Sequence, residues 1–139
     1  MPETESPRRI SRSIGAVLAG MLAVVVLSLG TDLALHAAGI FPPLDQRMSD
    51  ALFVLATAYR TVYAVAGGYV TAWLAPNRPV YHALVNGFIG VALSLLGAVL
   101  TWNKALGPHW YPLALVITAL PTAWAGGRLR LMQVGADRP

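Results

Sequence analysis

Arg60 is the residue that most needs a chemical explanation, because it stands alone in an apolar stretch. Residues 51–77 contain no other charged side chain. Tyr59 and Tyr63 flank Arg60 and offer hydroxyl groups to the same pocket. A guanidinium in such surroundings indicates contact with a polar or anionic ligand. The alternative is a structural arginine that extends to a membrane surface or caps carbonyl groups of a neighbouring helix.

Asp32 is the acidic residue placed to pair with Arg60. In a pair of antiparallel helices the two residues lie about 10 Å apart along the helix direction, a distance that a long arginine side chain nearly spans. However, Asp32 lies about 180° from the small residues of its own helix, which argues against the pair. The other reading makes Asp32 a residue of the membrane interface, one turn before His36. The sequence leaves both readings open.

No residue pattern indicates catalysis or a metal centre. The chain has no cysteine, and its three histidines, His36, His82 and His109, all fall near the ends of apolar segments rather than opposite one another. No Walker loop, nucleophile elbow or zinc-binding helix motif is present. We therefore expect no catalytic residue, no metal and no cofactor, and we expect that the protein is not an enzyme.

The distribution of charge predicts the elements that position these residues. Only 12% of the 139 residues are charged and 56% are hydrophobic, a composition typical of a membrane protein. Fixed charges are absent from four long segments, namely residues 13–31, 61–77, 79–103 and 105–127. A helix needs about 20 apolar residues to cross a bilayer. We predict an all-α polytopic membrane protein with a four-helix transmembrane domain over residues 13–130 and spans at about 13–35, 51–75, 82–102 and 111–127.

Small residues predict which helix faces pack together. Membrane helices approach closely where side chains are small, and hydroxyl and amide groups bond across the contact. The expected packing residues of the second and third spans are Gly67, Gly68, Gly87, Gly90, Ser94 and Gly97. In the first span the corresponding stripe contains Gly20, Ala23 and Gly30. The pattern Ala64-x-x-x-Gly68-x-x-x-Ala72 is also a candidate seam for self-association.

Basic residues predict the orientation of the chain. With four spans and the N-terminus inside, the cytoplasmic side holds seven of the ten basic residues, namely Arg8, Arg9, Arg12, Arg78, Arg128, Arg130 and Arg138. Arg47 and Lys104 lie on the opposite side, so the positive-inside rule favours cytoplasmic termini. Residues 1–12 are expected to be a disordered cytoplasmic tail, and residues 131–139 a short second tail. Because the arginines flank membrane spans, the basic balance indicates contact with membrane lipid and not with nucleic acid.

The second and third spans carry a family resemblance. The segment AYRTVYAVAGGYVTAWLAP at residues 58–76, followed by Arg78-Pro79 and by His82-Ala83-Leu84, resembles small four-span bacterial membrane proteins whose function is uncharacterised. The resemblance covers less than half of the chain. It implies a multi-pass protein of the bacterial inner membrane and supplies no activity.

Two functions remain open at this point. The first is a non-catalytic membrane scaffold or accessory subunit, whose partners are lipid and a second copy or another membrane protein. The second is a small oligomeric transporter of a polar or anionic solute, in which Arg60, Tyr59, Tyr63 and Asp32 contact the solute.

Overall fold

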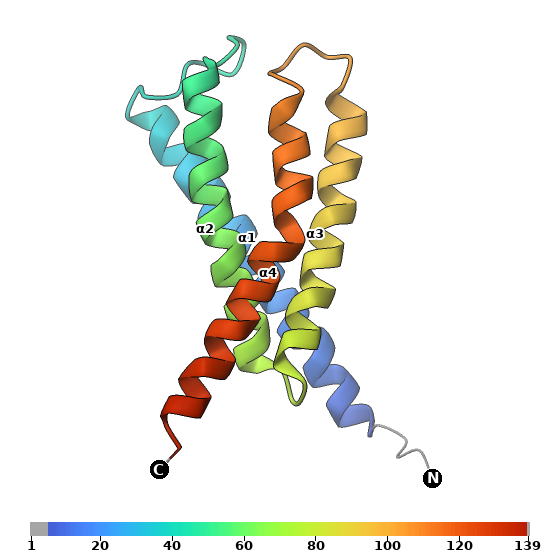
Figure 1. Cartoon of the computed structure of the whole chain (residues 1–139). Helices are drawn as coiled ribbons and strands as arrows, with labels where there is room; N and C mark the ends of the chain where they lie inside the picture. Colours follow the sequence, from blue (N-terminus) through green and yellow to red (C-terminus); the bar gives the residue numbers. More distant parts are fainter. Residues whose placement is uncertain (1–5, 139) are drawn as a thin grey trace.

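The computed structural model describes residues 6–138 and is all-α. Four helices follow one another along the chain: α1 (Pro7–Ala37), α2 (Asp50–Leu74), α3 (Pro79–Thr101) and α4 (Trp110–Ala136) (Figure 1). The first three are long and apolar enough to cross a membrane. In α4, two prolines, two tryptophans and a pair of glycines lower the mean hydropathy, and this helix is not among the three.

The helix ends follow local sequence signals. Pro7 and Pro79 stand in the first turns of α1 and α3, where the missing N–H of proline has no partner to lose. The Ser49 side chain caps α2 by accepting a hydrogen bond from the backbone N–H of Leu52 at 3.4 Å. Arg78 closes the tight turn before α3 with a left-handed backbone, at φ 39°.

Both terminal helices are longer than the sequence predicted. Residues 7–12 are helical, where a disordered tail was expected, because proline at the first helical position and the arginines after it favour a helix. Residues 1–5 of that predicted tail lie outside the described residues. At the other end α4 continues to Ala136 and takes up most of the predicted second tail, since no proline or unfavourable turn interrupts it.

The helices form two antiparallel hairpins that cross. α2 contacts all three other helices, and α4 packs along both α2 and α3. Figure 1 shows that the hairpins meet near the middle of the molecule and separate toward the loops at residues 38–49 and 102–109. The start of α1 and the end of α4 lie at the other end, together with the short turn between α2 and α3.

Glycines make the close contacts at the crossing. A Cβ atom added to Gly67 of α2 would lie 2.9 Å from the carbonyl oxygen of Gly20 in α1, and one added to Gly68 would lie 2.6 Å from that of Ala123 in α4. Gly87 of α3 also packs against Ala123. The backbones therefore touch where no side chain intervenes. Because α4 covers Gly68, the predicted self-association seam is occupied within the chain.

Hydrogen bonds between polar side chains also join the helices between the crossing and the α2–α3 turn. Thr71 is completely buried and accepts a hydrogen bond from Asn86 Nδ2 at 3.0 Å, so the amide bonds across the α2–α3 contact. His82 Nε2 lies 2.9 Å from the hydroxyl of Ser13, which joins α3 to α1. Such bonds satisfy polar groups that lipid leaves without a partner.

Candidate functional site

Arg60 forms an ion pair with Asp32. The Nη2 atom of Arg60 donates to Oδ2 of Asp32 at 2.5 Å, so the pair joins the middle of α2 to the last turns of α1. The hydroxyl of Tyr59 donates to the other carboxylate oxygen, Oδ1. Both oxygens of Asp32 are therefore occupied, and the structure selects the reading in which Arg60 and Asp32 pair.

Tyr63 extends the same contact by one turn. Its hydroxyl lies 2.7 Å from Oγ1 of Thr31, which itself donates to the carbonyl oxygen of Leu27 at 2.8 Å, so Tyr63 is the donor. The four residues predicted to form a polar site, Asp32, Tyr59, Arg60 and Tyr63, thus all lie at the α1–α2 interface. They bond to one another or to Thr31 and form a single polar cluster.

The face of α1 that meets α2 differs from the predicted one. Gly30 was expected at a helix contact, but a Cβ atom added there would meet no atom within 4 Å. The C-terminal half of α1 instead turns Ser28, Thr31 and Asp32 inward. Burying Thr31 and Asp32 against Arg60 and the tyrosines satisfies their hydrogen bonds, whereas an apolar neighbour would leave them without partners.

The pair is only partly enclosed. The side chains of Arg60 and Asp32 remain 30% and 22% exposed. Nε of Arg60 is buried and has no hydrogen-bond partner among the described residues. The guanidinium therefore neutralises Asp32 while several of its N–H groups stay unused.

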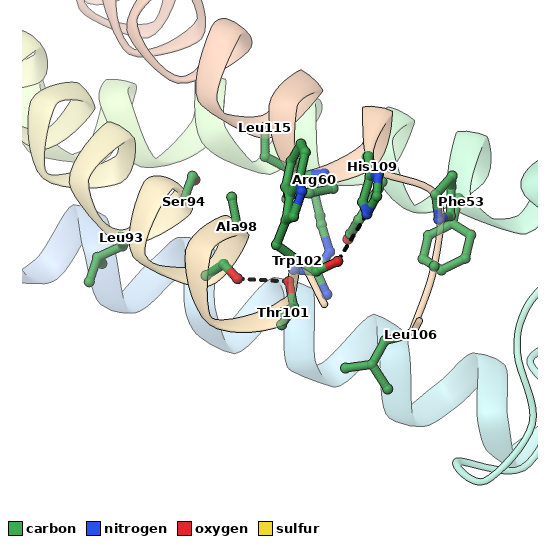
Figure 2. Close-up of a pocket in the computed structure, with 15 residues that line it drawn as sticks. Phe53, Arg60, Leu93, Ser94, Ala98, Thr101, Trp102, Leu106, His109 and Leu115 are labelled. Atoms are coloured by element: carbon green, nitrogen blue, oxygen red, sulfur yellow. Dashed lines mark hydrogen bonds between the residues drawn. The ribbon is translucent and has the colours of Figure 1, made fainter. Parts of the chain in front are cut away.

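Arg60 borders two cavities. The smaller, of about 240 Å³, lies beneath the loop that follows α1 and is lined by Asp32, His36, Tyr59 and residues of that loop. The larger, of about 450 Å³, lies between α2, α3 and α4 where the hairpins separate (Figure 2). Phe53 and Tyr111 line both cavities with Arg60, and their rings pack with centroids 4.9 Å apart.

Two residues predicted to pack helices line the larger cavity instead. Ser94 and Gly97 of α3 both face it, and a Cβ atom added to Gly97 would meet nothing within 4 Å. Gly90, one turn before Ser94, is in ordinary contact distance of α4, since a Cβ atom there would lie 3.6 Å from that of Ala119. The close contact of α3 with α4 therefore loosens beyond Gly90 and opens into the cavity.

Sequence reasoning missed several cavity residues. Tyr111 and Trp102 carried only the signal of interfacial aromatics. Phe53 falls on the same stripe of the second span as Arg60, which indicates helix packing and not a cavity. In the structure the rings of Trp102 and His109 stack at 4.1 Å, and Gly107 packs against the Phe53 ring, so the second long loop closes one end of the cavity. No local pattern marks a loop that folds back in this way.

This arrangement of side chains and cavities is suited to binding a ligand. It offers one neutralised cation, tyrosine hydroxyls and two spaces with apolar walls. Within residues 6–138, no group of three or more histidine, cysteine or acidic side chains is close enough to hold a metal ion. Comparison of the chain with protein family models, with curated proteins and with solved structures finds no match in any of the three.

Proposed function

We propose that the chain is a four-span integral protein of the bacterial inner membrane with both termini in the cytoplasm. Support comes from the arrangement of charge. The start of α1, the α2–α3 turn and the end of α4 lie at one end of the molecule (Figure 1). Arg78 and the arginines in the first turns of α1 and in the last turns of α4 occur at that end. Arg47 and Lys104 stand in the loops of the opposite end. This asymmetry fits the positive-inside rule.

The packing of α4 supports its role as the fourth span. This helix has 27 residues and contacts both α2 and α3, which satisfy the hydropathy requirement for crossing a membrane. A helix of that length extends about 40 Å, enough to cross a bilayer. Pro121 lies inside it, and membrane helices tolerate an internal proline when neighbours pack around the bend.

Reporter fusions test this topology. An alkaline phosphatase fused after Asn103 is expected to be active and one fused after Arg138 inactive, because the enzyme folds only outside the cytoplasm. A fluorescent protein that folds only in the cytoplasm, fused at the same two positions, is the matched control and is expected to give the reverse pattern. Phosphatase activity at Arg138 would show that the C-terminus is outside.

With this topology, the protein acts as a non-catalytic scaffold or accessory subunit. The observation that carries this proposal is the use of Arg60, the one charge in the middle of a span, in a bond between two helices of the same chain. Large exposed apolar side chains surround the bundle and are suited to lipid or to another membrane protein.

A small transporter is the second candidate. It is favoured by one observation, that Arg60 borders a cavity on each side and is not sealed inside the bundle. In that case a polar solute would pass the Arg60–Asp32 pair, and the tyrosines would contact it.

Exchange of the pair for apolar residues separates the two functions. In a strain that lacks the protein, the double variant Arg60→Met, Asp32→Leu is expected to restore the wild-type phenotype and to co-purify in mild detergent with the same membrane protein as the wild type. A transporter would lose its function in this variant. Loss of complementation at normal membrane levels, with no co-purifying protein for either form, would contradict the scaffold.

A further inference from the structure

The cavity between α2, α3 and α4 has the size and walls of a small-molecule site. Its volume of about 450 Å³ falls in the range of roughly 300–1,000 Å³ typical of such sites. Phe53, Leu93, Leu106 and Leu115 give it a mostly apolar surface (Figure 2). An occupant must therefore be largely apolar.

Two polar side chains on the wall already have partners in the chain. Thr101 Oγ1 donates to the carbonyl oxygen of Gly97 at 2.7 Å, and His109 Nε2 donates to that of Trp102 at 2.9 Å, as the dashed lines in Figure 2 show. Arg60 differs, because Asp32 accepts from Nη2 alone and Nη1 makes no hydrogen bond among the described residues. The hydroxyl groups of Ser94 and Tyr111 and the indole N–H of Trp102 likewise have no partner within residues 6–138. The unbonded groups on the wall are thus all able to donate a hydrogen bond, and Arg60 is the charged one among them.

The charge of that donor is already balanced. Asp32 lies 2.5 Å from Nη2, so Arg60 and Asp32 together carry no net charge. A second anion beside the pair would bring a net negative charge into apolar surroundings, at a desolvation cost that one arginine shared by two anions does not offset. A neutral acceptor such as a carbonyl oxygen takes a hydrogen bond from the guanidinium without that cost.

We propose that this cavity binds a neutral, largely apolar molecule that presents a carbonyl oxygen, as in an ester, to Arg60. The chain from the carbonyl group lies against the leucines and Phe53. This binding is independent of the scaffold function, since a scaffold or a transporter equally well accommodates a bound lipid-like ester.

Fluorescence quenching of Trp102 tests the proposal. All four tryptophans are exposed, but of these only Trp102 lines the cavity, so Trp73, Trp110 and Trp124 are replaced by Phe and Trp102 remains as the reporter on the cavity wall. The protein is held in alkyl maltoside micelles, which contain no carbonyl group. The probes are the methyl ester of ω-bromoundecanoic acid, the ionised acid at alkaline pH and the matching bromoalkane, because bromine quenches tryptophan on contact. The matched control keeps Trp73, which lines none of the cavities described above, as the single tryptophan.

The ester is expected to quench Trp102 saturably, and with about tenfold higher affinity than the acid or the bromoalkane, since a hydrogen bond to a charged donor contributes about that factor. Trp73 is expected to show only weak, unsaturable quenching. Equal or better binding of the acid would overturn the charge argument. Equal binding of the bromoalkane would overturn the hydrogen bond between the carbonyl group and Arg60. The same response at Trp73 would overturn the site itself, including the case in which a second copy of the chain fills the space.

Two variants tie the signal to this cavity. Gly97→Leu is expected to weaken ester binding at least about tenfold by filling open space on the wall. Gly30→Leu is the control, because an added side chain there also meets no atom within 4 Å but lines no described cavity. The double variant Arg60→Met, Asp32→Leu is expected to reduce ester affinity to that of the bromoalkane. Unchanged ester binding in both cavity variants would contradict the proposal.

Discussion

Replacing Asp32 by Leu is expected to lower the free energy of unfolding by about 2–3 kcal/mol, because it leaves the partly exposed Arg60 guanidinium in the bundle without its counter-ion. Tyr59 loses its acceptor in the same step. Arg60→Met leaves the opposite charge unpaired and is expected to cost a similar amount. The measurement is reversible unfolding of the purified protein in mixed micelles, followed by circular dichroism as the denaturing detergent is increased.

The double variant decides whether the two residues act as a pair. Arg60→Met with Asp32→Leu is expected to be as stable as the wild type or more stable, since apolar side chains of similar volume often replace a buried ion pair without loss. Arg9→Met, on the exposed first turns of α1, is the control and is expected to change stability by less than about 0.5 kcal/mol. Additive losses in the double variant would show that Arg60 and Asp32 contribute independently.

The sequence identifies Arg60 better than it identifies the partner of Arg60. Arg60 lies on the stripe of α2 that contains Ala56, Gly67 and Thr71, all of which are buried, and the helical period alone predicts that it faces the bundle. Asp32 was assigned by the same rule to the wrong face of α1. The size of the side chains decides which face of α1 meets α2 only near Gly20, where the two backbones touch. Farther along α1, the hydrogen-bonding needs of Thr31 and Asp32 decide which face meets α2. Helical spacing alone does not tell which of the two, small size or hydrogen bonding, prevails at a given turn.

The cavities could not be predicted, for a different reason. Each arises from the angle at which the two hairpins separate and from loops that fold back onto the bundle. The packing of Gly107 on Phe53 joins a loop residue to α2, and the stacking of His109 on Trp102 holds two residues of the same loop together; no common sequence pattern marks either contact. Helix existence, by contrast, depends on long apolar runs and on proline and serine at the ends, so the helices were predictable to within a few residues except at the two termini.

The central crossing leads to the second large effect. Gly68→Ala is expected to lower the free energy of unfolding by about 1–3 kcal/mol, because the new methyl group would lie 2.6 Å from the carbonyl oxygen of Ala123 and force α2 and α4 apart. Backbone atoms of a helix cannot swing aside as a flexible side chain does, so the separation extends along the contact. The same detergent titration measures the loss.

Gly30→Ala is the matched control for this substitution. It adds the same methyl group in open space and restricts the unfolded chain in the same way, so it is expected to leave stability unchanged or to raise it by up to about 1 kcal/mol. The opposite signs of the two substitutions isolate close packing from helix propensity. Equal effects at Gly68 and Gly30 would mean that α2 and α4 do not touch at the crossing. The close contact from which the two hairpins separate to form the cavities would then be absent.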